Sequence, residues 1–228
     1  RAGIGARHPE ALIRTCSGFP PPPAEAAAWA DGMQAVLAGP GLEPDAAAAD
    51  MVSAFCGLEA PIVLDAGALA VIAREPDRFF PALAERNVRG WPPAVLTPHP
   101  GEFIRLDPEA DLTDRVGASR RLALRTGCIV ALKGAGTTVA SPDGGCAINT
   151  TGGDGLAKGG SGDVLAGLLA GLLAQGIPPW EAACAAVCLH GLAGDAAAAR
   201  LGRRAMLPGD LPMYFSEAFR TAGWEEQT

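Results

Sequence analysis

A glycine-rich stretch at residues 149–162 is the part of the chain best suited to chemistry, because it runs directly into an apolar stretch at residues 164–174. A glycine-rich turn at the start of a buried helix leaves several backbone N–H groups without an acceptor. Those N–H groups and the positive end of the helix dipole attract phosphate and other anions. Glycine has no Cβ atom, so a ligand can approach the backbone closely there. The residues of the predicted anion site are Gly159, Gly160, Ser161 and Gly162.

Asp163 stands at the junction of the two stretches and is the candidate general base. At a helix N-terminus its carboxylate stays ionised, and it is placed to take a proton from a substrate hydroxyl near the anion site. The same N–H groups would stabilise negative charge on a transferring or leaving phosphate. The alternative is that Asp163 only caps the first turn of its own helix. Beside the GGSG sequence we favour the general base.

Further polar side chains follow predicted strands. His99 lies between two prolines on a stiff loop, and it is either a functional group or a hydrogen-bonded structural residue. Glu102 either orients a hydrated Mg²⁺ ion or is a solvated loop charge. Lys133 either neutralises nucleotide phosphate or is an exposed lysine at a strand end. Thr137, on the same loop, would add a hydroxyl contact to the nucleotide.

Short apolar strands alternate with helices along the chain, and these elements must position the candidate groups. Strands are predicted at residues 35–38, 61–64, 93–97 and 128–132, with a hairpin at 137–148. Helices are predicted at residues 44–57, 68–74, 113–126, 164–175 and 179–200, with a last one within 208–224 and an extended connector over residues 1–23. This alternation is typical of a doubly wound α/β fold with a mostly parallel sheet.

Ligands of such sheets bind beyond the carboxyl ends of the strands. That edge would bring the loops after the strands next to the glycine-rich helix start. The loops are residues 39–41, Asp65, residues 97–102 and residues 133–137. The convergence of these features on one edge is stronger support for a site than any one of them alone.

Composition favours one soluble globular domain, because the 228 residues are 49% hydrophobic and 19% charged. The net charge of −7 argues against a nucleic acid as partner, since phosphate contacts need clustered Lys and Arg. The longest apolar run, residues 164–174, is shorter than the roughly 20 residues that cross a bilayer, and no signal peptide is recognised. We therefore expect no membrane contact.

The six cysteines contain no CxxC pair, and none of the three histidines lies at metal-ligand spacing from them. Reduced, mostly buried thiols in a cytoplasmic protein are therefore expected. His190, Cys184 and Cys188 are expected to pack in the core, and His8 carries no functional signal. No Walker A, early GxGxxG or GxSxG pattern is present, which disfavours P-loop NTPases, Rossmann dehydrogenases and serine hydrolases.

Three motifs together resemble those of the ADP-dependent NAD(P)H-hydrate dehydratases, a family of the ribokinase-like superfamily. They are residues 96–102 (LTPHPGE), residues 132–137 (LKGAGT) and residues 159–167 (GGSGDVLAG). Residues 38–42 (AGPGL) and 63–69 (VLDAGAL) fit the same family in the same order, and the resemblance covers about residues 36–200. It implies a ribokinase-like three-layer α/β sandwich, with a mostly parallel central sheet flanked by helices. We expect residues 1–228 to form a single domain of this kind.

The resemblance implies an enzyme that repairs damaged nicotinamide cofactors. Such a lyase removes water from the hydrated ring of NADHX or NADPHX, with Mg²⁺ and with ADP (or ATP) as co-substrate. Asp163 would activate the ring hydroxyl for transient phosphorylation, and loss of phosphate would restore the double bond. The resemblance also implies a homo-oligomer.

Site residues carry over by position in this sequence. Gly41, His99 and Asp163 would line the site of the hydrated nicotinamide. The adenine nucleotide would be held by Lys133, Gly134, Ala135, Gly136, Thr137 and Gly162. One departure from the family pattern is Lys158, which adds a positive charge beside the phosphate site and would alter nucleotide preference. The family's first strand and early substrate loop have no counterpart here, so we expect that part of the domain to lie upstream of Arg1.

Two other functions remain open. A kinase of the same superfamily acting on a small alcohol, such as a vitamin precursor or a sugar, would use the same anion site and base. It would differ in needing ATP and in leaving a phosphorylated product. A non-catalytic nucleotide-binding protein would bind nucleotide without turning over any hydrate.

Overall fold

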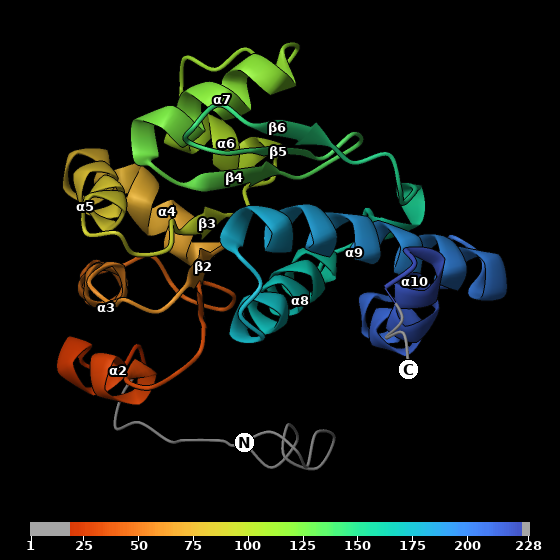
Figure 1. The fold of residues 1–228 in the computed structure, drawn as a ribbon, viewed down its shortest axis with the longest axis horizontal. Helices are drawn as coiled ribbons and strands as arrows, with labels where there is room; N and C mark the ends of the chain where they lie inside the picture. Colours follow the sequence, from red (N-terminus) through yellow and green to blue (C-terminus); the bar gives the residue numbers. More distant parts are fainter. Residues whose placement is uncertain (1–18, 225–228) are drawn as a thin grey trace.

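The central sheet is built from short apolar strands, and the computed structural model describes it within residues 19–224 (Figure 1). Its six strands follow one another in chain order across the sheet. They are β1 (Val36–Ala38), β2 (Ile62–Leu64), β3 (Val95–Leu96), β4 (Ile129–Leu132), β5 (Thr138–Ala140) and β6 (Cys146–Ile148). Strands β1 to β4 pair in parallel, and β4, β5 and β6 pair antiparallel. The expected mostly parallel sheet and its hairpin are confirmed.

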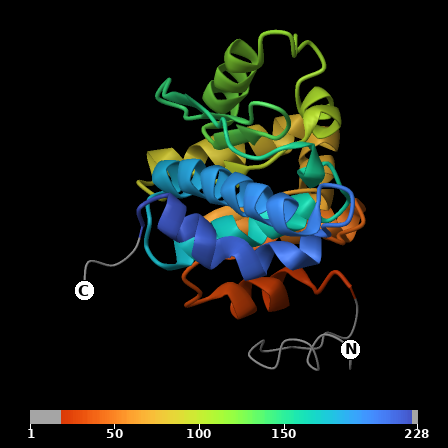
Figure 2. The ribbon, with the colours of Figure 1, turned by 90° about the vertical axis from the view of Figure 1, so that its right-hand side faces the viewer.

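Helices cover both faces of this sheet (Figures 1 and 2). One face carries α3 (Ala46–Cys56), α4 (Gly67–Arg74), α5 (Pro76–Val88), α6 (Pro100–Leu106) and α7 (Arg115–Thr126), and α2 (Pro23–Ala30) packs on α3. The other face carries α8 (Ser161–Ala174), α9 (Pro179–Leu201) and α10 (Phe215–Thr221). Two 3₁₀ helices, η1 (Asp154–Leu156) and η2 (Pro208–Tyr214), lie in the connections.

Alternate strand residues supply two separate cores. In β4, Val130 and Leu132 pack among α2 to α7, whereas Ile129 and Ala131 pack against α8 and α9. Side chains of a strand point alternately to opposite faces, so a strand covered on both faces needs apolar residues throughout. This explains why the strands are continuous apolar runs, and it confirms the three-layer fold.

Prolines begin three helices that the sequence analysis did not place. Pro23, Pro76 and Pro100 each occupy the first helical turn of α2, α5 and α6. Residue 23 had been expected to end a connector and residues 97–102 to form a loop, and no helix was predicted over residues 76–88. Proline has no N–H to lose at the first position of a helix, where no acceptor exists in any case. These predictions were wrong because such a proline marks a helix start as readily as a stop.

Helix α9 is the described helix that is long and apolar enough to cross a membrane. Its apolar residues are interspersed with small and polar ones, so it contains no long uninterrupted apolar run. In the structure, 56% of its most apolar window is buried. It packs against α8 and α10 beside the sheet, as core helices of globular proteins do (Figure 2).

Arg86 is a buried residue that hydrogen-bonds both to the segment between α3 and β2 and to the segment between α5 and β3. This α5 residue is only 1% exposed, and its guanidinium donates to the carbonyl groups of Cys56, Leu58, Ala60 and Pro92. Burial lowers the pKa of Arg86 from its usual value. No carboxylate accepts from it in the described chain, so its charge is stabilised by carbonyl dipoles and by the ring of Trp91, whose centroid lies 5.8 Å from Cζ.

We expect the Arg86→Met substitution to lower the free energy of unfolding by about 3 kcal/mol, because it leaves several buried carbonyl groups without a donor. Denaturation by urea, followed by circular dichroism, measures this. Arg89→Met is the matched control: Arg89 is exposed, pairs with Glu85 on the surface, and should matter by less than about 1 kcal/mol. Equal losses in the two variants would contradict the assigned role of Arg86.

Candidate active site

A cleft of about 830 Å³ lies at the carboxyl ends of the parallel strands, beside the start of α8. Its lining includes residues from the loops after β2, β3 and β4 and from the glycine-rich stretch, as expected. Of the candidate residues these are His99, Glu102, Lys133, Gly134, Ala135, Gly136, Thr137, Gly159, Gly160, Ser161, Gly162 and Asp163. Gly41 is not among the lining residues. Its turn packs on the loop after β2, because a Cβ on Gly39 would lie 1.7 Å from the carbonyl oxygen of Asp65.

The start of α8 presents backbone N–H groups to the cleft. Gly160 precedes the helix in the left-handed region, with φ of 94°, and no side chain caps the helix. Within residues 19–224, the N–H of Ser161 bonds to the carbonyl of Lys158, whereas the N–H groups of Gly162 and Asp163 have no acceptor. Together with the helix dipole they form an anion site.

Asp163 is the third residue of α8, and its side chain is exposed. Its carboxylate makes no hydrogen bond or ion pair with the described part of the chain, and it does not cap the helix by a hydrogen bond. Asp163 thus makes no capping hydrogen bond, although its charge in the first turn also suits the helix dipole. A carboxylate with free lone pairs beside an anion site is placed to accept a proton from a bound hydroxyl.

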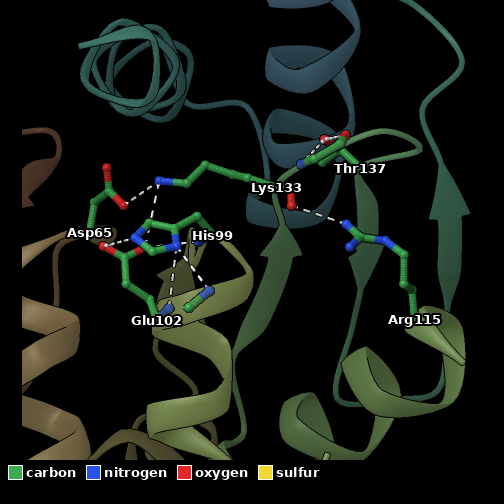
Figure 3. A network of polar contacts seen from close by, with 8 residues as sticks. Asp65, His99, Glu102, Arg115, Lys133 and Thr137 are labelled. Atoms are coloured by element: carbon green, nitrogen blue, oxygen red, sulfur yellow. Dashed lines mark hydrogen bonds and ion pairs between the residues drawn. The ribbon is translucent and has the colours of Figure 1, made fainter. Parts of the chain in front are cut away.

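Lys133 is held by two buried carboxylates (Figure 3). Its Nζ atom lies 2.8 Å from Oδ1 of Asp65 and 3.9 Å from Oε2 of Glu102. Asp65 is 1% exposed and Glu102 is 8% exposed, so Glu102 is no solvated loop charge and Lys133 is no freely exposed lysine. Two carboxylates face one ammonium group, and this cluster therefore carries an excess negative charge.

His99 is the N-cap of α6 and also lines the cleft. Its Nδ1 atom accepts from the N–H groups of Gly101 at 3.0 Å and Glu102 at 3.4 Å, and Glu102 in turn accepts from the His99 N–H at 2.8 Å (Figure 3). Because Nδ1 is an acceptor, the proton of the neutral ring sits on Nε2. The capping box thus leaves Nε2–H as the donor of this ring.

The loop after β4 is closed on itself. The hydroxyl of Thr137 accepts from the N–H of Gly134 and donates to its carbonyl. Arg115, the first residue of α7, donates from one nitrogen to the carbonyls of Leu132 at 2.8 Å and Lys133 at 3.1 Å (Figure 3). Arg115 was not among the residues expected at the site. The one available signal was the position of Arg115 in a first turn, where a cation opposes the helix dipole.

His190 reaches the cleft from α9, although the sequence suggested only core packing. It is 7% exposed, and its Nε2 atom lies 3.3 Å from the hydroxyl oxygen of Ser161 at the start of α8. Burial lowers the pKa of His190 to about 4, so the ring is neutral near neutral pH. Spacing within one helix gave no hint of this contact, since Ser161 lies on another helix.

The cysteines of the described residues are free thiols, as expected. Burial raises the pKa of Cys184 to about 11, which keeps it protonated, and it packs beside the core formed with α8. Among residues 19–224 no three His, Cys, Asp or Glu side chains form a metal-binding group. His8 and Cys16 lie outside the described residues.

The sheet, its covering helices and the anion site at a helix start define a ribokinase-like α/β protein. A solved ribokinase-like superfamily protein from Enterococcus faecalis aligns with a TM-score of 0.75 and 28% identity, covering 96% of this chain and 74% of that one. The sequence profile of the family described as NAD(P)H-hydrate dehydratase matches residues 7–216. The chain belongs to the NAD(P)H-hydrate dehydratase family.

Two relatives illustrate how far the similarity extends. The bifunctional NAD(P)H-hydrate repair enzyme Nnr of Gloeobacter violaceus is 45% identical over 86% of this chain, and the match spans 37% of that relative's length. The chain thus spans little more than a third of this relative. The solved ADP/ATP-dependent NAD(P)H-hydrate dehydratase of Bacillus subtilis is 30% identical, with a TM-score of 0.77, covering 96% of this chain and 77% of that one.

We expect His99→Ala to lower the free energy of unfolding by about 1 kcal/mol, because the N–H groups of Gly101 and Glu102 lose their cap. His99→Asn should stay within about 0.5 kcal/mol of the native protein, since asparagine is a good N-cap. Urea denaturation of the two variants makes the comparison. A loss in His99→Asn as large as that in His99→Ala would show that capping is not what the imidazole contributes.

Stability should depend on pH through His190. Its pKa is about 4 in the folded protein and about 6.5 when unfolded, so the unfolded state binds more protons between these values. This contribution is fully present above about pH 6.5, and about 3 kcal/mol is lost as the pH falls to about 4. Unfolding free energies of the native protein and His190→Gln, measured across this range, isolate it. Parallel curves for the two proteins would rule it out.

Proposed function

We propose that this protein removes water from hydrated NADH or NADPH and restores the reduced cofactor, in a reaction that consumes an adenine nucleotide. The observation that carries the proposal is the unbonded carboxylate of Asp163 beside the free N–H groups of α8, in a chain of the dehydratase family. The names of the Gloeobacter and Bacillus relatives supply the substrate class and the nucleotide dependence.

The chemistry assigned to Asp163 is proton transfer. The ring hydroxyl of the hydrate would give its proton to this carboxylate as its oxygen attacks the terminal phosphorus of the nucleotide. The bond from that phosphorus to the bridging oxygen would break, and the nucleotide would leave with one phosphate fewer. The N–H groups of Gly162 and Asp163 would hold the phosphate and stabilise its charge. The C–O bond would then break, phosphate would leave with both electrons, and the neighbouring ring carbon would give a proton to water as the double bond forms.

We assign the hydrated nicotinamide to the side of the cleft with His99. The Nε2–H of this ring is oriented by the capping box and lies 3.5 Å from Oε1 of Glu102, so a substrate acceptor would share or replace that contact. Gly41 is proposed as a contact at the rim, because its left-handed turn, with φ of 74°, leaves open space beside its Cα atom. Asp163 would stand between the substrate and the nucleotide.

We assign the adenine nucleotide to the closed loop Lys133–Thr137 and the glycine-rich segment, which line the same cleft. The charge of Lys133 is already balanced by Asp65 and Glu102, so Lys133 alone would add little net attraction for the phosphates. The two carboxylates fit a Mg²⁺ ion held mainly by phosphate and water, with Glu102 as an outer partner. Such an ion would supply positive charge to the phosphates, and the Bacillus structure was co-crystallised with ATP and Mg²⁺.

We further propose that residues 1–228 act as a single domain of a cytoplasmic homo-oligomer, without nucleic acid or membrane as partner. The net charge of −7 supports the absence of a nucleic acid partner. The free cysteines of the described chain suit a reducing compartment.

We expect the protein to produce the near-ultraviolet absorbance of reduced nicotinamide when mixed with NADHX or NADPHX, Mg²⁺ and ADP or ATP, and not without nucleotide. Asp163→Asn should lower kcat about 10²- to 10⁴-fold, because it removes the proton acceptor while keeping the shape of the side chain. Nucleotide binding by this variant, measured by calorimetry, serves as the control for an intact cleft.

Full turnover by Asp163→Asn would exclude the assigned base. If nucleotide binds, the absorbance does not rise, and the protein phosphorylates a small alcohol with ATP, the protein is a kinase instead. Nucleotide binding with neither reaction would identify a non-catalytic binding protein.

A further inference from the structure

The side chain of Lys158 connects the glycine-rich stretch to the turn that follows α9. Its Nζ atom donates to the carbonyl oxygens of Arg203 at 2.9 Å and Arg204 at 3.1 Å, and also to that of Met206. An ammonium group has three N–H donors, and these three acceptors occupy all of them. In this arrangement Lys158 has no donor left for a phosphate, which differs from the direct effect on the nucleotide expected from sequence.

The acceptors of Lys158 lie just beyond the last residue of α9, Leu201. In the described chain no backbone N–H donates to these three carbonyl groups, so the ammonium group of Lys158 is the donor that satisfies them. The side chain of Arg203 forms a separate, exposed ion pair with Asp154 at 3.3 Å. Lys158 therefore binds the main chain of this turn, whatever side chains the turn carries.

Two packing contacts join the same segments. A Cβ on Gly155 would lie 2.6 Å from the sulfur of Met206, which is itself 1% exposed. The two segments of the chain are therefore in close contact there. A Cβ on Gly160 would lie 3.7 Å from Pro208. Residues 155–160 thus rest on residues 203–208 at three points, and Lys158 supplies the polar one.

The main chain of Lys158 holds the start of α8. Its carbonyl accepts from the N–H of Ser161 at 3.1 Å, and Ser161 is followed by the free N–H groups of Gly162 and Asp163. A shift of Lys158 would therefore move the first turn of α8. Because hydrogen bonds weaken steeply with distance and angle, a small shift would weaken contacts to an anion.

We propose that Lys158 is a positioning residue for the nucleotide site: by binding residues 203–206 it fixes the N–H groups at the start of α8. This inference rests on the proposed function, and it adds the segment after α9 to the residues on which nucleotide affinity depends. Lys158 itself does not contact the nucleotide in this scheme.

The test is Lys158→Met, which keeps an unbranched apolar stem and removes the donors. The Kd of ADP by calorimetry and the KM for nucleotide should rise about tenfold. At saturating nucleotide kcat should also fall, because Asp163 lies in the same turn of α8, whereas the KM for hydrate should stay within about twofold, because His99 lies on another element. Arg203→Ala is the matched control: it keeps the carbonyl acceptor, removes the exposed ion pair, and should leave the Kd of ADP within about twofold.

An unchanged Kd of ADP in Lys158→Met overturns the inference, and so does an equal loss in every parameter, which would indicate general structural support. If Lys158→Met folds poorly, Lys158→Arg is the second variant to measure. Its planar guanidinium keeps the charge but cannot reproduce the three-carbonyl geometry, so the Kd of ADP should still rise. ADP binding by a native protein that fails to dehydrate the hydrate would refute the proposed function and leave this test valid.

Discussion

Free N–H groups in the first turn of α8 are the feature on which the arrangement of the cleft depends. They remain free because Gly160 enters the helix in a left-handed conformation and no side chain caps it. A helix start left open in this way is unfavourable unless solvent or an anion satisfies it. The sheet directs its strand ends toward this point, so that the loops after β2, β3 and β4 face the same N–H groups. Fold and anion site are thus two consequences of one topology.

The side-chain cations around the cleft are already paired, and this leaves the backbone N–H groups of α8 as the groups available to bind phosphate. The two lysines of the cleft are both held by internal partners, Lys133 by Asp65 and Glu102, and Lys158 by main-chain carbonyls. No arginine is among the residues that line it. An incoming phosphate therefore meets N–H dipoles rather than free side-chain cations. Dipoles fixed by the backbone need no rearrangement when charge develops on a reacting phosphate, which is the condition for electrostatic catalysis.

The fold could be predicted from sequence where a local pattern is sufficient. Strands buried on both faces appear as apolar runs, and the hairpin has its own turn residues, so both were found. Helices that begin at Pro76 and Pro100 were missed, because a proline signals a start or a stop according to tertiary context.

The site, too, could be predicted only where a local sequence motif is sufficient. Motifs identified many of the lining residues, but they also pointed to Gly41, which does not line the cleft. No spacing rule could pair Lys133 with Asp65, or place His190 next to Ser161, since each pair is joined only by the folded chain.

Several residues of the candidate site also stabilise the local structure, so the same side chains serve both the fold and the site. His99 caps α6 through the same nitrogen that fixes its tautomer, so the hydrogen bonds that hold the helix also decide which ring nitrogen can donate to a ligand. Thr137 closes its loop with the hydroxyl expected to contact the nucleotide, and that hydroxyl already both donates and accepts. A nucleotide must therefore use its remaining lone pair or displace one of these bonds. Binding at this loop is then coupled to loop conformation, because the groups that would recognise the ligand are the groups that hold the empty loop in shape.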